Sequence, residues 1–182
     1  MKQIPDQLQR QIWATEQEIL DVIHQVCTEY GLRYSLAYGT LIGAVRHKGF
    51  IPWDDDIDLM MPREDYEKLL AIWNEAAPKG YILQNTRTDP DFTQNFTKIR
   101  KDHTTFLQGE SEREKHYHKG IFVDIFPGRP QQVGKKHSVH SLCDQPAVQS
   151  RAYKWFRRID WKSRKYLTQG AKGKIHHKTR AC

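Results

Sequence analysis

Four aspartates stand within five positions of this sequence, in the stretch GFIPWDDDIDLMMP at residues 49–62, and they are Asp54, Asp55, Asp56 and Asp58. Two carboxylates about 4 Å apart repel each other by roughly 4 kcal/mol at an effective dielectric constant near 20. A solvated loop avoids this repulsion, but the aliphatic residues that follow at once are typical of a buried strand. We therefore expect a positive charge to bind among these carboxylates.

A further carboxylate of this kind is Asp124, which stands inside the apolar stretch IFVDIF. Residues two apart in a strand share a face, so Asp56 and Asp58 should point the same way while Ile57 points into the core. If the two strands are neighbours, Asp124 joins the pair. Several carboxylate ligands are typical of a hard cation such as Mg²⁺ or Mn²⁺. The sequence therefore predicts a metal site at Asp56, Asp58 and Asp124.

Phosphate-binding candidates lie on both sides of the aspartates. Gly39 and Thr40 follow an expected strand and begin a helix, where backbone N–H groups and a hydroxyl can cradle phosphate. Arg46 follows within reach of the same opening. Lys98 and Arg100 are two apart on an expected strand, so they share a face and are further candidates; a solvated strand face is the alternative for both.

Each of these features also has an ordinary explanation when it is taken alone. An acid-rich turn is often a solvated surface, Asp124 by itself could cap the end of a strand, and a Gly-Thr pair is most often only a turn. Their order along one chain argues against three separate coincidences. We therefore treat them as one candidate active site.

The elements that must position these residues indicate an α+β protein with a mixed sheet flanked by helices. Apolar residues at three- and four-residue spacing predict helices over 6–30 and 63–76, and a glycine turn followed by a short helix is expected over 39–47. The polar stretch 109–119 is expected to be a loop. Period-two patterns and aromatic or β-branched residues predict strands at 33–38, 56–61, 80–84, 95–101, 104–108 and 120–127.

The charge changes sign along the chain. Residues 1–127 hold 15 Lys and Arg against 20 Asp and Glu, a net charge of −5, whereas residues 128–182 hold 14 against 2, a net charge of +12. We therefore expect a boundary near Pro127, with a folded core over 1–127 and a basic C-terminal segment over 128–182. Residues 152–167 have the pattern of a basic helix, and the end beyond them is expected to be disordered.

The cysteines and the termini indicate the compartment. Cys27, Cys143 and Cys182 are odd in number and lack CxxC spacing, which argues against a disulfide framework or a zinc site and for a reducing environment. The first residues lack the apolar core of a signal peptide, and no apolar run is long enough to span a bilayer. We expect a cytoplasmic location, with peripheral contact at the inner face of the membrane as an extension of it.

The stretch YSLAYGTLIGAVRHKGFIPWDDDIDLMMPREDYEKL resembles the signature of the LicD family, which is related to fukutin and the fukutin-related protein. FTKIRKDHTT and KGIFVDIFP resemble the next two blocks of that family, in the same order. The resemblance covers roughly residues 15–127 and is most specific over 34–69. It implies a nucleotidyltransferase (polymerase-beta-like) core. The gap between Thr40 and Asp56 is longer than in the general pattern of that fold but fits this family's version.

The resemblance implies transfer of phosphocholine, or a similar phospho-alcohol, from a CDP-activated donor to a glycan hydroxyl. In bacteria the typical donor is CDP-choline and the acceptor a sugar of teichoic acid or lipopolysaccharide. By the same resemblance, Asp56 and Asp58 hold one or two Mg²⁺ or Mn²⁺ ions on the donor's pyrophosphate. Asp124 then completes the metal site or takes the proton of the acceptor hydroxyl.

The remaining roles follow from the same donor. Gly39 and Thr40 would seat the nucleotide phosphates, with Arg46 assisting electrostatically. A quaternary ammonium calls for aromatic contacts, and Tyr38 and Trp53 are the candidates nearest the motif, with ordinary core packing as the alternative for both.

After Pro127 the resemblance ends, and three explanations of the basic segment stay open. We favour a truncated or frameshifted product; the others are an arm that contacts anionic lipid or a polyanionic acceptor, and nucleic-acid binding through KWFRRIDWKSRKY, which we do not expect. Two alternatives to the phospho-alcohol transferase follow. One is a nucleotidyltransferase that moves AMP or UMP to another acceptor, and the other is an inactive member that only binds polyanions.

Overall fold

A computed structural model gives the structure of the protein and describes residues 6–128. Our expectations for residues 129–182, including a basic helix over 152–167, a disordered end and an origin by truncation, lie outside the described residues. The boundary near Pro127 is not tested by this structure.

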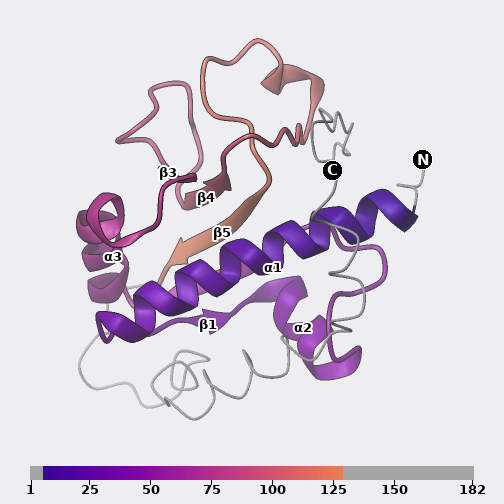
Figure 1. Cartoon of the computed structure of the whole chain (residues 1–182), viewed down its shortest axis with the longest axis horizontal. Helices are drawn as coiled ribbons and strands as arrows, with labels where there is room; N and C mark the ends of the chain where they lie inside the picture. Colours follow the sequence, from indigo (N-terminus) through magenta and orange to yellow (C-terminus); the bar gives the residue numbers. More distant parts are fainter. Residues whose placement is uncertain (1–5, 129–182) are drawn as a thin grey trace.

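Five strands form one mixed sheet in the order β1-β2-β5-β4-β3 (Figure 1). β2 pairs with β5 in parallel, and the other three pairs are antiparallel. This confirms the α+β class and the mixed sheet. The strands are β1 (Ser35–Leu36), β2 (Asp58–Met61), β3 (Tyr81–Gln84), β4 (Thr97–Lys101) and β5 (Phe122–Pro127).

Three helices and one 3-10 turn accompany the sheet. The helices are α1 (Asp6–Glu29), α2 (Tyr38–Arg46) and α3 (Arg63–Ala76), and the turn is η1 (Glu110–Glu112) within the loop expected over 109–119. α1 crosses the sheet between β5 and β1 in Figure 1 and packs against β4 and β5. Its buried apolar face follows the three- and four-residue spacing of the sequence and comprises Ile12, Ile19, Leu20, Ile23, Val26 and Cys27. No helix of the described part is long and apolar enough to cross a bilayer.

Two strand predictions need correction. The stretch 104–108 is not a strand: His103 has a positive φ of 57°, which turns the chain out of β4, and Phe106 then packs its ring 5.7 Å from that of Phe122. The burial of Phe106 explains why the sequence resembled a strand. β2 begins at Asp58 rather than Asp56, so Asp56 lies in the segment that enters the strand.

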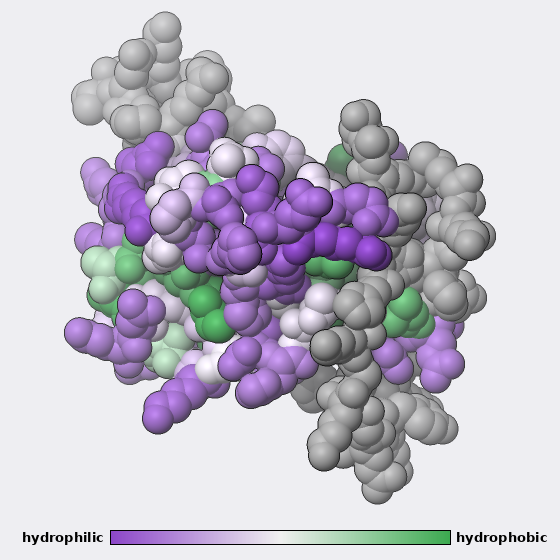
Figure 2. Space-filling view, turned by 90° about the horizontal axis from the view of Figure 1, so that it is seen from above, coloured by the Kyte–Doolittle hydropathy of each residue, from purple (hydrophilic) through white to green (hydrophobic). Residues whose placement is uncertain are grey.

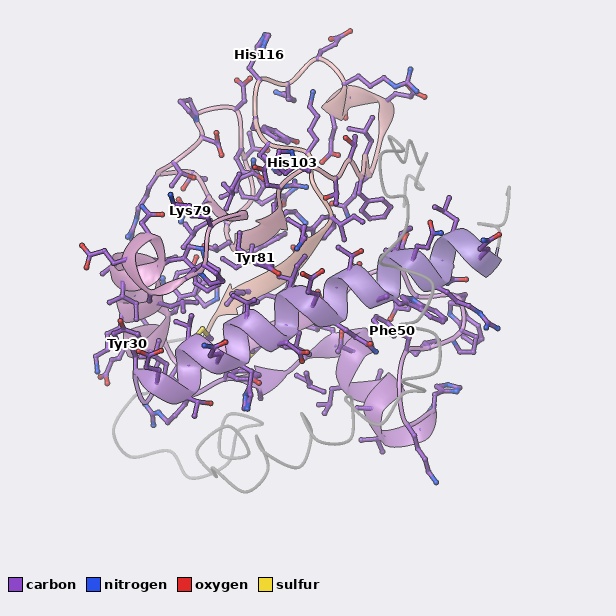
Figure 3. All side chains as sticks on the ribbon, in the orientation of Figure 1. Tyr30, Phe50, Lys79, Tyr81, His103 and His116 are labelled. Carbon is purple, nitrogen blue, oxygen red and sulfur yellow. The ribbon has the colours of Figure 1, made fainter. Side chains whose placement is uncertain are left out.

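The long connections of the sheet gather on one side. The segments between β3 and β4 and between β4 and β5 lie at the top of Figure 1, and His116 stands at their far tip in Figure 3. Seen from that side, the surface is mainly hydrophilic, with a smaller hydrophobic group beside it (Figure 2). The register of the sheet sets Asp58 of β2 and Lys98 of β4 on either side of Asp124 of β5, because both residues pair with Asp124.

Candidate metal centre and active site

Three aspartates from two distant parts of the sequence meet at the start of β2 and the middle of β5. Asp56, Asp58 and Asp124 each offer a carboxylate oxygen, and these oxygens lie within 4.8 Å of one another. The parallel pairing of β2 with β5 brings this about, because it sets Asp58 directly beside Asp124. The convergence expected from the sequence is therefore confirmed. Asp54, Asp55 and Asp56 form a second group of the same kind.

The loop that carries these aspartates is fixed by α1. Trp13 donates from Nε1 to the Asp54 carbonyl oxygen at 2.8 Å, and Gln9 donates from Nε2 to the same oxygen at 3.2 Å. The Trp13 ring also stacks on Phe50 at 4.8 Å, and Figure 3 shows Phe50 beside this helix. The first half of α1 therefore sets the path of the acidic loop.

The glycine and the threonine at the start of α2 also act on this loop. A Cβ on Gly39 would lie 2.6 Å from Asp54 Oδ2, so any side chain there would displace the Asp54 carboxylate. Thr40 is buried, and its hydroxyl accepts a hydrogen bond from the Asp58 backbone N–H at 2.8 Å. Gly39 and Thr40 therefore directly shape the cluster of aspartates. Their expected binding of phosphate stays a prediction.

Lys98 contacts the Asp124 carboxylate, whereas Arg100 has other partners. Lys98 Nζ donates to both oxygens of Asp124, at 2.7 and 2.9 Å, and sits 3.3 Å from the centroid of the Phe122 ring. Arg100 is fully buried and donates to the Gln84 side chain and to the Gly120 carbonyl oxygen. The alternative of a solvated strand face is therefore wrong for both residues. Phosphate binding by either one is untested.

The carboxyl groups resist ionisation in the metal-free protein. Burial, followed by repulsion from Asp56 and Asp124, raises the pKa of Asp58 to about 8. Burial and the neighbouring carboxylates raise the pKa of Asp54 to about 6. Burial also raises the pKa of Asp124 to about 6, against the opposing charge of Lys98. Each of these shifts favours a bound cation, because a cation removes both the repulsion and the cost of burying charge.

The two aromatic candidates for choline have different surroundings. Tyr38 is half exposed, has a strained positive φ of 41°, and lies edge-on to Phe126 at 5.1 Å. Phe126 in turn packs on Phe96 at 4.5 Å, and Phe126 stands two residues after Asp124, on the same face of β5. Trp53 is 72% exposed and faces His47 at 6.4 Å. The core-packing alternative is therefore wrong for Trp53.

Arg46 lies in the last turn of α2 and is exposed. The structure thus brings together Asp56, Asp58, Asp124 and Lys98, with Thr40 bonded to Asp58 and Gly39 against Asp54. It leaves Arg46, Trp53 and Arg100 outside that group.

Sequence reasoning missed Glu16 and the Phe96–Phe126 pair. Glu16 has no exposed surface, and burial followed by the charges of the acidic loop raises its pKa well above the usual value. One signal was available: Glu16 stands four residues from both Ile12 and Leu20, so it occupies the apolar face of α1. Phe96 and Phe126 carried no signal of their own, because their contact depends on how β4 and β5 pair.

The described residues fit a hard divalent cation. Three carboxylates with oxygens this close are the ligand chemistry that Mg²⁺ and Mn²⁺ prefer. The three carboxylates lie where the parallel strands β2 and β5 pair, with Asp56 in the segment that enters β2.

The chain belongs to the LicD/FKTN/FKRP family. The family model described as LicD/FKTN/FKRP, nucleotidyltransferase domain, matches residues 31–153, about two thirds of the sequence. The match therefore continues past Pro127, and our expectation that the resemblance ends there was wrong. The chain is 36% identical to the lipopolysaccharide cholinephosphotransferase LicD of Haemophilus influenzae over 123 residues, which are 65% of this chain and 46% of that protein. It is 29% identical to the human ribitol 5-phosphate transferase FKRP over 101 residues, 56% of this chain and 18% of that protein. The chain thus spans less than half the length of these curated relatives.

Proposed function

We propose that this protein transfers phosphocholine, or a similar phospho-alcohol, from a CDP-activated donor to a glycan hydroxyl with the help of Mg²⁺ or Mn²⁺. The observation that carries the proposal is the meeting of Asp56, Asp58 and Asp124 within 4.8 Å in a member of this family. One relative is named as a cholinephosphotransferase and another as a ribitol 5-phosphate transferase, which supports phospho-alcohol transfer as the shared chemistry.

The transfer exchanges one phosphate ester oxygen for another. The acceptor hydroxyl oxygen forms a bond to the phosphorus that carries the alcohol, the bond from that phosphorus to CMP breaks, and the hydroxyl proton leaves to a base. The cation, when bound, neutralises the negative charge that develops on CMP. Asp56, Asp58 and Asp124 would hold it, and Gly39 and Thr40 would bind the donor phosphates beside it.

Lys98 favours the ligand role of Asp124 over the role of base. Its Nζ occupies one lone pair on each Asp124 oxygen, and its positive charge lowers the basicity of the carboxylate. The remaining lone pairs are left for a cation shared with Asp56 and Asp58. Lys98 thereby opposes the rise in the pKa of Asp124 that burial causes.

The alcohol of the donor would lie over the aromatic row of Tyr38, Phe126 and Phe96. These rings continue the face of β5 that carries Asp124, so a donor whose pyrophosphate is at the aspartates can reach them. A quaternary ammonium is attracted to aromatic faces. Choline therefore suits this row better than ribitol does.

The test is a thermal melt of the full chain with Mn²⁺ and CDP-choline, run beside CDP-ribitol, ATP and UTP. A ligand at about a hundred times its dissociation constant stabilises the protein by roughly 2.7 kcal/mol, a Tm shift of roughly 5–10 °C for a chain of this size. We expect a Mn²⁺-dependent shift with CDP-choline that is lost in Asp58→Asn.

Each other outcome counts against the proposal in its own way. A shift with ATP or UTP and none with a CDP-alcohol would support transfer of AMP or UMP instead. No response to any nucleotide, with salt-sensitive binding to polyanions that survives in Asp58→Asn, would support the inactive polyanion-binding alternative.

A further inference from the structure

One buried carboxylate has no place in the roles given so far. Glu16, in the middle of α1, has 0% exposure, and neither of its carboxylate oxygens has a hydrogen-bond partner within residues 6–128. Almost all buried polar atoms in folded proteins are hydrogen-bonded, and an unpaired buried charge is strongly unfavourable. Glu16 therefore calls for a partner that the described chain does not supply.

The position of Glu16 on α1 shows where that partner should be. Gln9, Trp13 and Glu16 are spaced by four and three residues, so they lie along one face of the helix. Gln9 and Trp13 both donate to the Asp54 carbonyl oxygen, and Glu16 follows one turn further along the same face. The charges that act on its carboxyl group are, from largest to smallest, those of Asp56, Asp55, Asp124 and Asp54. Glu16 is thus a buried acceptor directed at the metal centre.

Glu16 suits contact with a cation through water rather than direct ligation. Glu16 belongs to neither group of carboxylates whose oxygens lie within 4.8 Å of one another. Mg²⁺ gives up its water reluctantly and keeps several water ligands in protein sites. Carboxylates just outside the direct ligands commonly accept hydrogen bonds from such groups and orient them.

We propose that Glu16 is a positioning residue of the metal centre, whose buried carboxylate accepts a hydrogen bond from a water molecule bound to the cation held by Asp56, Asp58 and Asp124. The water supplies the missing donor, and the cation offsets the buried negative charge. This inference rests on the proposed metal-dependent function. Glu16 itself lies before residues 31–153, which the family model matches.

The experiment uses the full chain with Glu16→Gln, which keeps the size of the side chain, and Glu29→Gln as the control, since Glu29 is an exposed carboxylate at the end of the same helix. Mn²⁺ affinity is measured by calorimetry, the Mn²⁺ environment by electron paramagnetic resonance, and stability by melts with and without Mn²⁺. We expect Glu16→Gln to weaken Mn²⁺ binding about 10- to 100-fold and to change the resonance spectrum. Without metal it should melt no lower than the unmodified chain, since a buried carboxylate has been removed. Glu29→Gln should match the unmodified chain in all three.

The outcomes separate this inference from the proposed function. Unchanged Mn²⁺ affinity in Glu16→Gln, with a lower melting temperature in the metal-free state, would make Glu16 a structural residue and overturn the inference alone. Failure of the unmodified chain to bind Mn²⁺ would overturn the proposed metal dependence as well. If Glu16→Gln does not melt cooperatively, Glu16→Met makes the same comparison with a side chain of similar volume and no polar oxygen.

Discussion

Aspartates are buried in two regions of the molecule, and the two regions differ in how much positive charge the chain supplies beside them. Near the start of α3, the Asp65 side chain is 6% exposed and pairs with Arg33, which donates to Asp65 Oδ2 from its backbone N–H at 3.2 Å and from Nε at 2.7 Å. The chain itself thus supplies both the donors and the positive charge. Asp65 can be explained entirely as a residue that joins α3 to the segment before β1.

The candidate metal centre places more carboxylates around less positive charge. Asp56, Asp58 and Asp124 all receive their largest positive influence from the same Lys98, and Asp54 and Asp56 hydrogen-bond to each other. We infer that the carboxylate that the chain neutralises is structural, and we propose that the carboxylates left in excess bind a cation from solution. Four predictions test this distinction.

The largest effect is expected on catalysis. Asp58→Asn removes a metal ligand, and because metal ions contribute several kcal/mol of charge stabilisation in the transition state, CMP release from CDP-choline in the presence of a glycan acceptor should fall on the order of a thousandfold. Asp65→Asn should stay within a few-fold of the unmodified chain under conditions where it is folded. Equal losses in the two variants would erase the distinction between the regions.

The next effect concerns the ion pairs that each region contains. Lys98→Met leaves Asp124 buried without its cation, and breaking a buried pair in this way costs about 3–5 kcal/mol. Asp65→Asn should cost about 1–3 kcal/mol, because Arg33 is 41% exposed and can turn to water. Urea unfolding measures both losses.

The response to Mn²⁺ then separates the two variants. The ion should recover part of the stability lost in Lys98→Met, since Asp124 gains a replacement cation, and none of that lost in Asp65→Asn. Recovery in both variants, or in neither, would contradict the assignment of Asp124 as a ligand.

A pH series sharpens the same comparison. The pKa of Asp58 is raised from 3.8 to about 8 in the folded, metal-free protein, so over this interval the folded state binds more protons than the unfolded state. Its contribution to stability is therefore largest below pH 3.8 and is lost as the pH rises towards about 8. We expect the free energy of unfolding without metal to fall less steeply over this interval in Asp58→Asn, and Glu29→Gln to retain the slope of the unmodified chain. Identical slopes in all three would show that Asp58 titrates normally.

Local patterns along the chain were enough to predict much of the fold. The spacing of Tyr66, Leu69 and Trp73 after Pro62 predicted α3 with the bounds that the structure has, Arg63–Ala76. The alternation of acidic and aliphatic residues around Ile57 predicted that Asp56 and Asp58 would point away from the core. The strand predicted over 104–108 was wrong for a physical reason. Phe106 is buried because it packs on Phe122, and an apolar residue in the sequence does not show whether it is buried in a strand or in a packed loop.

The contacts that decide the chemistry depended on tertiary pairing. Lys98 and Asp124 are 26 residues apart, and their ion pair follows from the register of β4 against β5. Glu16 and Asp56 are brought together by the packing of α1, which no local pattern specifies. The convergence of Asp56, Asp58 and Asp124 was therefore predictable. Lys98 was expected as a site residue, but its ion pair with Asp124 and the burial of Glu16 were not expected.

The smallest effect separates the two aromatic candidates for choline. Tyr38 contacts Phe126 on the strand of Asp124, whereas Trp53 contacts His47 on the exposed side of the loop. Loss of one cation–π contact at a half-exposed site is worth about 0.5–1 kcal/mol, so Tyr38→Ala should weaken CDP-choline binding roughly two- to fivefold and leave CDP binding unchanged. Trp53→Ala should change neither, and Tyr38→Phe should retain the affinity. Calorimetry with CDP-choline and CDP in the presence of Mn²⁺ measures the difference. If Trp53→Ala gave the larger and choline-specific loss, the alcohol would bind over the loop side of the carboxylates, and the aromatic row along β5 would be packing alone.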